Sequence, residues 1–208
     1  MNYFITGTDT GVGKTYVTCL LVRSLRRAGF DTVGMKPICC GGRSDAESLL
    51  EASGGGYTLD EINPVWLPMP AAPYATERLE KGAVNPGAIR SAFARLRGTH
   101  RSLLVEGVGG WRVPVAKGLF MSDLAREFGL PVLVVVRNRL GALNHTVLTV
   151  ERIVADGLQC GGIILNHADA AEEDEATAVN RAILEELLEA PVLFEIKAGQ
   201  KALSLGIV

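Results

Sequence analysis

The residues best suited to chemistry follow the first apolar run of the chain, where residues 7–15 read GTDTGVGKT. Gly11 and Gly13 let backbone N–H groups turn toward an anion without side-chain clashes. A helix that begins at Lys14 adds the positive end of its dipole. The Lys14 ammonium can contact the outer phosphates of a nucleotide, and the Thr15 hydroxyl can bind Mg²⁺. The stretch therefore predicts a phosphate-binding loop.

The spacing of this loop differs from the usual pattern, in which four residues separate the two glycines. Here five residues separate Gly7 from Gly13, so that Thr8 stands where the first glycine is usual. The physical requirements are still met, because Gly11, Gly13 and the helix start are all retained. The alternative interpretation is a plain glycine-rich turn between a strand and a helix.

Further polar residues stand at the ends of apolar runs, and these are Lys36, Glu106 and Asn166. Mg²⁺ prefers oxygen ligands and needs only one or two carboxylates, so Glu106 is a candidate ligand beside Thr15. Asp45 lies in the first turn of a predicted helix, where an acidic residue also stabilises the helix dipole. From the residues alone, both roles of Asp45 stay open.

Other features restrict the chemistry. Residues 107–110 (GVGG) predict either a plain tight turn or a place where backbone N–H groups approach an anion. No nucleophile–base pair stands out, since His100, His145 and His167 are scattered along the chain. Phosphoryl transfer needs no protein nucleophile, because positioning and electrostatics can carry it.

The elements that must position these residues alternate between short apolar runs and longer amphipathic segments. We predict strands at residues 3–6, 32–36, 102–106, 131–136, 160–165 and 192–196. We predict helices at residues 14–28, 44–52, 86–97, 142–155 and 171–189. Ser44 and Glu47 have the spacing of a capping box for the second helix. Residues 54–82, rich in Gly and Pro, are predicted as loop.

Strands separated by helices predict an α/β fold, a single-domain parallel sheet of the P-loop NTPase type with helices on both faces. The run PVLVVV at residues 131–136 shows no alternation, which is typical of a strand covered on both faces. In such sheets, ligands bind beyond the carboxyl ends of the strands. We therefore expect the loop, Lys36, Glu106 and Asn166 to meet at one edge.

Composition favours one globular domain over residues 1–208, because 48% of the residues are hydrophobic and 21% are charged. The formal net charge of -2 offers no general attraction to nucleic acid or to an anionic membrane. Neither a signal peptide nor a long apolar span is expected. Cys19, Cys39, Cys40 and Cys160 form no CxxC pair, which favours reduced thiols in a cytoplasmic protein.

As a set, the motifs of this chain resemble those of the dethiobiotin synthetase family. They are GTDTGVGKT, KP at residues 36–37, SDA at 44–46, EGVGGW at 106–111 and LGALNH at 140–145. They occur in the family's order and span most of the chain. The resemblance implies a P-loop ligase of biotin biosynthesis that uses ATP and Mg²⁺ and works as a homodimer.

The resemblance also implies the reaction, whose substrates are 7,8-diaminononanoate, CO₂ or bicarbonate, and ATP. One amine captures CO₂ as a carbamate, and the γ-phosphate of ATP is transferred to that carbamate. The other amine then displaces phosphate and closes the five-membered ureido ring. Because the reacting groups lie on one molecule, orientation can contribute about 7–11 kcal/mol.

The resemblance assigns the nucleotide and metal contacts. It implies that the ATP phosphates bind at Gly11, Val12, Gly13, Lys14 and Thr15, with Glu106 and Gly109 beside them. It implies that Asn166 reads the adenine. The positions that match Mg²⁺ ligands are Thr15, Asp45 and Glu106.

The resemblance likewise assigns the substrate contacts. Thr10, Lys14 and Lys36 match residues around the carbamate and the transferred phosphate, where cations offset developing charge. Further positions that match the substrate site are Cys40, Gly109 and Gly110. Gly141, Ala142 and Asn144 match a segment that reaches the substrate carboxylate from the other subunit.

The chain departs from the family pattern in three places. Gly11 stands where an acidic residue is common, and Cys40 stands where a small hydroxyl residue is expected. No proline follows Glu195 and Ile196, in a region that helps form the base pocket of relatives. The preference for a particular nucleotide base is therefore left open.

Two rival functions remain. One is a related amide-forming ligase, although this chain has no room for the glutaminase domain that some relatives carry. The other is a P-loop ATPase switch of the partitioning type. Such proteins place a lysine early in the loop, whereas here no lysine precedes Lys14 in the chain.

Overall fold

The main sheet runs through the middle of the molecule, and the computed structural model describes residues 1–80, 83–100, 102–167 and 175–203. The strands of this sheet are β1 (Asn2–Gly7), β2 (Thr32–Met35), β5 (Ser102–Gly110), β8 (Val132–Arg137), β9 (Cys160–His167) and β10 (Val192–Lys197). Their order is β10-β9-β8-β1-β5-β2, and every pairing is parallel. The predicted parallel sheet is confirmed.

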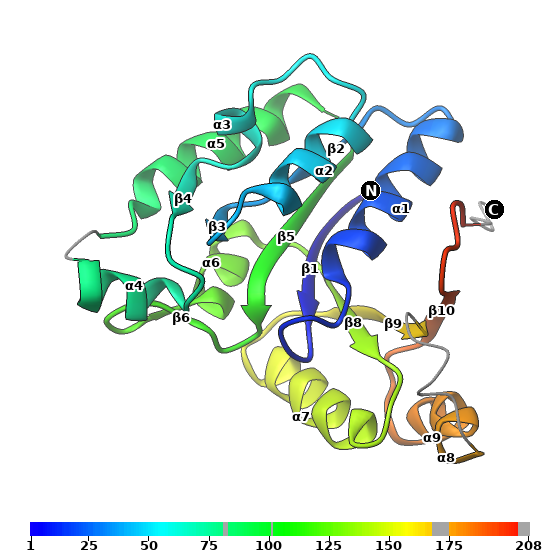
Figure 1. The fold of residues 1–208 in the computed structure, drawn as a ribbon. Coiled ribbons are helices and arrows are strands. Elements are labelled where there is room, and N and C mark those ends of the chain that lie inside the picture. Colours follow the sequence, from blue (N-terminus) through cyan, green and yellow to red (C-terminus); the bar gives the residue numbers. More distant parts are fainter. Residues whose placement is uncertain (81–82, 101, 168–174, 204–208) are drawn as a thin grey trace.

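Helices cover both faces of this sheet. They are α1 (Lys14–Arg27), α2 (Ser44–Ala52), α5 (Pro86–Thr99), α6 (Met121–Phe128), α7 (Ala142–Ala155), α8 (Glu175–Ala178) and α9 (Asn180–Leu187). In Figure 1, α1 and α2 lie in front of the sheet, and α5 and α6 lie behind it. Because both faces are covered, residues 132–136 of β8 are all buried, as the lack of alternation predicts.

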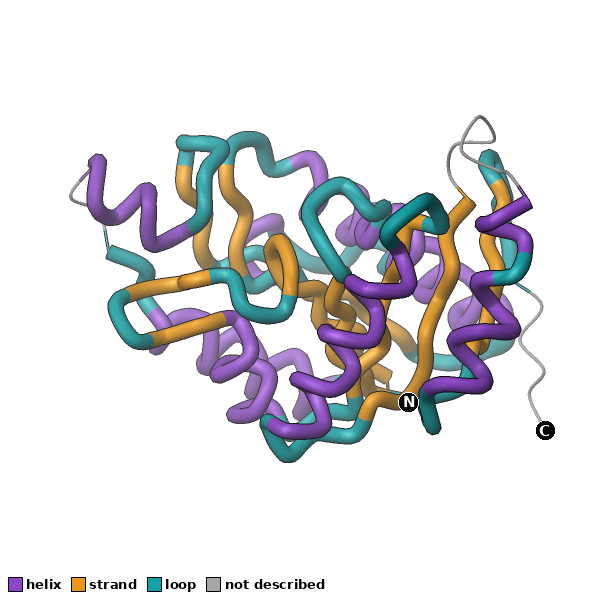
Figure 2. The backbone as a smooth tube through the Cα atoms, turned by 90° about the horizontal axis from the view of Figure 1, so that it is seen from below, coloured by secondary structure: helices purple, strands orange, loops and turns teal. Residues whose placement is uncertain are grey.

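The carboxyl ends of the strands form the edge on which the functional residues lie. The arrows of β1, β5 and β8 point toward the same lower edge in Figure 1, and Figure 2 is viewed from that side. Strand β1 lies between β5 and β8. The loop that follows β1 is therefore placed among the ends of neighbouring strands.

The segment at residues 54–82 contains regular structure in its described part, so the loop prediction was wrong. It contains α3 (Leu59–Ile62), β4 (Val65–Leu67) and α4 (Pro73–Glu80), and β4 pairs in parallel with β3 (Ile38–Cys40). Thr58 and Glu61 form a capping box at α3. Gly and Pro content misled the prediction, because proline is also favoured in the first turn of a helix, as at Pro73.

The capping box predicted at Ser44 and Glu47 is wrong. Ser44 is the first helical residue of α2, and the N-cap position is Arg43, which makes no side-chain cap bond. The Arg43 guanidinium instead donates to Asn63 Oδ1 at 3.0 Å and to Asp60 Oδ1 at 2.8 Å. The helix begins at Ser44 itself, one residue earlier than a capping box with Ser44 as its N-cap requires.

Three other stretches also differ from prediction. Residues 107–110, predicted as a turn, extend β5 to Gly110. No element was predicted at residues 111–130, which form β6 (Pro114–Ala116), β7 (Leu119–Phe120) and α6. In place of one helix at 171–189, the structure has the short α8 and α9, while residues 171–174 of that prediction lie outside the described residues.

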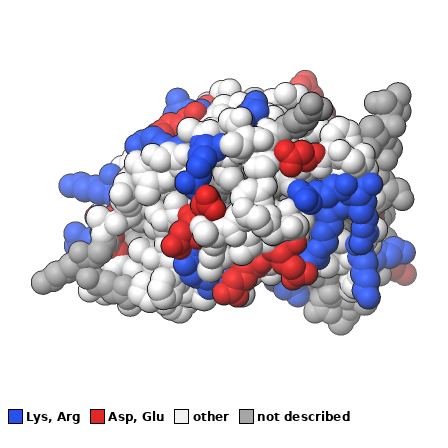
Figure 3. Space-filling view, turned by 90° about the horizontal axis from the view of Figure 1, so that it is seen from above, with Lys and Arg blue, Asp and Glu red and all other residues white. Residues whose placement is uncertain are grey.

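The charged side chains on the surface visible in Figure 3 are of both signs, in agreement with the small net charge of -2. Figure 3 looks onto the edge opposite the carboxyl ends, where basic and acidic side chains both appear among uncharged ones. Among the described residues, no helix is long and apolar enough to cross a membrane.

Candidate active site

The loop between β1 and α1 has the backbone that phosphate binding requires. Gly11 and Gly13 have φ values of +74° and +87°, in the left-handed region. Gly13 has a second constraint, because a Cβ there would lie 2.1 Å from Nδ2 of Asn166. The strand-to-helix turn is therefore shaped by glycines, and its N–H groups stand at the positive end of α1.

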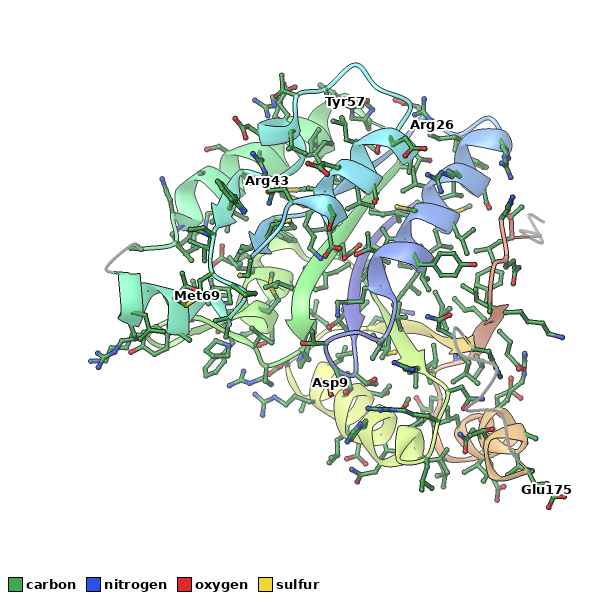
Figure 4. All side chains as sticks on the ribbon, in the orientation of Figure 1. Asp9, Arg26, Arg43, Tyr57, Met69 and Glu175 are labelled. Carbon is green, nitrogen blue, oxygen red and sulfur yellow. The ribbon has the colours of Figure 1, made fainter. Side chains whose placement is uncertain are left out.

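The Lys14 side chain folds back over this loop. Its Nζ donates to the Asp9 carbonyl at 3.0 Å, and only 7% of the residue is exposed. Asp9 lies at the tip of the loop below β1 (Figure 4). Burial and the nearby Lys36 ammonium lower the pKa of Lys14 to about 8. A bound anion would favour the charged form of this lysine.

Lys36 lies between two carboxylates. Its Nζ donates to Glu106 Oε1 at 2.5 Å and to Asp45 Oδ2 at 2.8 Å. Thr15 Oγ1 donates to the same Glu106 oxygen at 2.7 Å. Lys36 and Glu106 are 3% and 0% exposed. Residues from β1–α1, the end of β2, the start of α2 and β5 thus meet in one polar cluster, in which Lys36 and Glu106 are buried and Asp45 is half exposed.

The charges in this cluster stabilise one another. Burial alone would lower the pKa of Lys36, but the Glu106 and Asp45 charges outweigh it and raise that pKa above its ordinary value. Burial would raise the pKa of Asp45, and the Lys36 charge, with hydrogen bonds from Lys36 and Thr15, lowers it instead. Lys36 is therefore a fixed cation and Asp45 a fixed anion at neutral pH.

The oxygen atoms of this cluster fit a Mg²⁺ ion. Glu106 Oε2 is buried without a hydrogen-bond partner, so one carboxylate oxygen is left for another ligand. Thr15 and Asp45 supply further hard oxygen donors next to it. Within the described ranges, no group of three or more His, Cys, Asp or Glu side chains could hold a metal. This donor set, with two carboxylates and a hydroxyl, suits an ion that keeps several waters.

Asn166 lies beside the loop with one unused polar atom. The residue is the next to last of β9 and is fully buried, and its Nδ2 donates to the Val12 carbonyl at 2.9 Å. Its Oδ1 is buried without a partner. A buried acceptor next to the phosphate loop fits an N–H donor on the base of a nucleotide.

A cavity of about 650 Å³ joins these groups. Ten of the residues predicted for the site line it, namely Thr10, Gly11, Gly13, Lys14, Thr15, Lys36, Cys40, Asp45, Glu106 and Gly109. Val12 is buried in the core, and Asn166 and Gly110 lie outside the lining. Gly110 packs instead against the start of the loop, since a Cβ there would lie 3.4 Å from the Gly7 carbonyl.

The structure does not bring Gly141, Ala142 and Asn144 into this cavity. They lie at the start of α7, where Gly141 is the N-cap with a φ of +88°. The neighbouring Leu140 is 86% exposed.

Sequence reasoning missed several residues that line the cavity. These are Tyr16, Cys39, Gly42, Pro70, Ala71, Ala72, Val108 and Val113. Tyr16 follows the loop directly and could have been found from its place in the first turn of α1. Residues 70–72 could not, because they lie beside residues distant in the sequence: they follow β4, which pairs with β3, and Pro70 lies next to Gly41.

A family model and curated relatives both match this chain over nearly its whole length. A family model described as an AAA domain matches residues 1–201. An ATP-dependent dethiobiotin synthetase from Akkermansia muciniphila is 46% identical, covering 100% of this chain and 97% of the relative. One from Anaeromyxobacter dehalogenans is 44% identical, covering 99% of this chain and 95% of the relative.

Solved structures are similar in fold alone. The septum site-determining protein MinD from Pyrococcus horikoshii, complexed with Mg-ADP, has a TM-score of 0.57 at 18% identity and covers 95% of this chain and 82% of its own. A ParA family ATPase from Chlorobium tepidum has a TM-score of 0.58 at 12% identity, with 94% and 83% covered. Both support the P-loop fold class. With the identities of the full-length relatives, the chain belongs to the dethiobiotin synthetase family.

Proposed function

We propose that this chain joins CO₂ to 7,8-diaminononanoate with ATP, forming dethiobiotin through a phosphorylated carbamate. The observation that carries the proposal is the cavity in which Lys14, Lys36 and the oxygens of Thr15, Asp45 and Glu106 meet beside the phosphate loop. Cations and hard oxygen ligands around one space are what phosphoryl transfer needs. We further propose that residues 1–208 act as one ATP-binding domain.

The nucleotide site uses the loop and the amide beside it. Backbone N–H groups of Gly11, Val12 and Gly13 hold the phosphates, and Lys14 neutralises their outer charge. Asn166 Oδ1 accepts from the amino group of adenine, which supplies the partner that this buried atom lacks. Thr15, Asp45 and Glu106 hold Mg²⁺, which supplies charge neutralisation on the phosphates when bound.

The reaction balances without a protein nucleophile. The lone pair of one substrate amine attacks CO₂, and loss of a proton leaves a carbamate anion. A carbamate oxygen attacks the γ-phosphorus of ATP, and the bond to ADP breaks. The second amine attacks the carbamate carbon, phosphate departs with the bonding electrons, and the attacking nitrogen gives up one proton to solvent as the ring closes.

Lys36 acts in this sequence as a fixed positive charge. Because its pKa lies above the ordinary value, it remains an ammonium at neutral pH and is unsuited to the role of base. Together with Lys14 and the Thr10 hydroxyl, it stabilises negative charge on the carbamate and on the transferred phosphate. These three residues line the same cavity.

The rest of the cavity suits the carbon chain of the diamine. The wall of the cavity is apolar at residues 70–72, Val108 and Val113. Gly109, which has no side chain, lets the substrate come close to the backbone there. Gly109 has a φ of +59°, and a Cβ there would lie 2.5 Å from Val113 Cγ2. Cys40 contributes a thiol whose pKa is raised by burial to about 11, so it contacts the substrate as a neutral group.

The proposal includes a homodimer in the cytoplasm. Gly141, Ala142 and Asn144 do not line the cavity of their own chain, and we assign them to the site of the partner subunit. The exposed Leu140 and Leu148 give that region an apolar surface. Free Cys19, Cys39, Cys40 and Cys160 are compatible with a reducing compartment.

The test measures ADP release with each substrate omitted in turn. We expect release to require both the diamine and bicarbonate, and ¹³C-bicarbonate to label the ureido carbon of the product. Full-rate ADP release without the diamine would favour an ATPase switch and contradict the proposal. A product that carries nitrogen from added ammonia would favour an amide-forming ligase instead.

A further inference from the structure

The segment that follows β10 docks along α1, and this contact is unexplained by the roles assigned above. Residues 197–200 form a tight turn, in which Gln200 N–H donates to the Lys197 carbonyl at 3.2 Å. The Gln200 side chain closes the same turn, because its Oε1 accepts from Lys197 N–H at 3.1 Å. We name residues 197–203 the C-terminal segment.

Two groups of contacts hold the C-terminal segment on α1. At the far end of the helix, Ser24 Oγ accepts from Leu203 N–H at 3.0 Å, and Arg27 donates to the Lys201 carbonyl at 3.5 Å. At the end next to the phosphate loop, the Tyr16 hydroxyl donates to the Gln200 carbonyl at 2.6 Å. Leu203 is buried, so the far end is anchored by packing as well.

The Tyr16 contact lies at the start of α1, next to the phosphate loop. Tyr16 lines the cavity with Gly13, Lys14 and Thr15. Strand β10 pairs with β9 so that Ile196 is opposite Asn166 and Lys197 is opposite His167. The C-terminal segment therefore leaves the sheet next to the strand end that carries Asn166, and its turn contacts Tyr16 at the start of α1.

We propose that Tyr16 is a positioning residue for recognition of the nucleotide base, acting through the C-terminal segment. Its hydroxyl holds the Lys197–Gln200 turn against the start of α1, so that this turn and Asn166 form two sides of the base site. The inference rests on the proposed function in one respect, that ATP binds at the phosphate loop. Tyr16 takes no part in the chemical step.

The structure separates this role from simple anchoring. Loss of the Tyr16 hydroxyl leaves the contacts of Ser24 and Leu203 intact, so the C-terminal segment stays attached at its far end. Loss of the Tyr16 hydroxyl therefore frees only the part of the C-terminal segment that lies beside the phosphate loop. A hydrogen bond of this kind contributes about 1 kcal/mol, which corresponds to roughly a fivefold change in an equilibrium constant.

The experiment compares Tyr16→Phe with the wild type in titrations with ATP and with inorganic tripolyphosphate, which has phosphates but no base. We expect the Kd of ATP to rise about fivefold and that of tripolyphosphate to stay within twofold. The KM for ATP rises by the same factor, kcat is unchanged, and discrimination between ATP and GTP falls.

Two further variants make the result decisive. Tyr57→Phe removes a hydroxyl that bonds His100 at the opposite edge of the sheet, and it should change neither Kd. Gln200→Ala loosens the same turn from within, so it should raise the Kd of ATP without adding fully to Tyr16→Phe.

Several outcomes would overturn the inference. An unchanged Kd of ATP in Tyr16→Phe would do so, and so would an equal loss of affinity for ATP and tripolyphosphate, since that places the effect on the loop. A wild-type protein that binds tripolyphosphate but not ATP would instead refute the proposed function, whatever Tyr16 does.

Discussion

The two edges of the main sheet carry polar clusters of opposite character. At the carboxyl edge, Lys14, Lys36 and Glu106 are 7%, 3% and 0% exposed, and Glu106 and Asn166 each keep a buried oxygen without a partner. At the amino edge, His100 bonds both Tyr57, at 3.1 Å, and Asp31, at 3.0 Å. The Asp31 side chain there is half exposed.

The carboxyl-edge cluster differs in that its contribution to folding stability does not by itself explain why it is present. Burying charges costs free energy that their mutual attraction only partly offsets, and an unsatisfied buried oxygen adds to the cost. The amino-edge cluster links elements at the surface and carries little such cost. The carboxyl-edge cluster is therefore best explained by ligands that complete it.

The largest effect is expected for Lys36→Ala. The change leaves Glu106 buried beside Asp45 without the cation between them, which should lower stability by about 3–5 kcal/mol. It should also reduce kcat by about 10³-fold, since a cation near the transferred phosphate is lost. Thermal unfolding and steady-state turnover measure the two effects.

Arg90→Ala is the matched control for Lys36→Ala. Arg90 also bonds a glutamate, Glu127, at 2.6 Å, but that pair lies on the surface. The Arg90→Ala substitution should change neither kcat nor the free energy of unfolding measurably. If Lys36→Ala kept near-normal turnover, the catalytic role of Lys36 would be refuted.

The next effect concerns two glycines of one loop. Gly13→Ala forces a Cβ to within 2.1 Å of the Asn166 amide at a positive φ, so it should weaken ATP binding about 100-fold. Gly11→Ala has a positive φ but nothing within 4 Å of the new Cβ, so backbone strain of about 1–2 kcal/mol is the only cost. Calorimetric titration with ATP compares the two variants, and equal losses would contradict the contact with Asn166.

A smaller effect is expected from pH, because the pKa of Lys14 is lowered to about 8. Above that pH the folded protein loses the Lys14 charge, so ATP affinity should fall by up to about tenfold per pH unit. Stability changes with the opposite sign. Between pH 8 and the ordinary value of 10.5, the unfolded chain binds more protons at Lys14, so this group's contribution rises with pH.

Lys14→Ala provides the check on this pH effect. The variant should bind ATP weakly with no such fall between pH 8 and 9. A wild-type affinity that stays flat across the same range would show that Lys14 does not govern phosphate binding through its charge.

The smallest effect is expected at the amino edge. Tyr57→Phe removes the hydrogen bond to His100 and should lower stability by about 1 kcal/mol, as measured by urea unfolding. Its kcat and KM should equal those of the wild type. A clear kinetic defect would mean that the two edges are coupled, which the comparison between them does not predict.

Two local features of the chain were predicted correctly. The apolar run of β8 and the Gly-Lys-Thr start of α1 depend on local pattern, and both are found as predicted. The convergence of Lys36, Glu106 and Asn166 also follows from local pattern, because parallel strands bring their carboxyl ends together. The predictions at residues 54–82 and 107–110 were wrong, because glycine and proline content does not distinguish a loop from a short helix start or a strand end.

Local chemistry in the chain was enough to indicate a phosphate loop, a parallel sheet and, with the resemblance, a family of ligases. It could not show that Lys36 is fixed between Asp45 and Glu106, that residues 70–72 line the cavity, or that Tyr16 holds the C-terminal segment. Each of these depends on packing between residues far apart in the sequence. The geometry of the folded sheet and helices determines such contacts. A pattern of neighbouring residues does not predict them, because the residues in contact are far apart in the sequence.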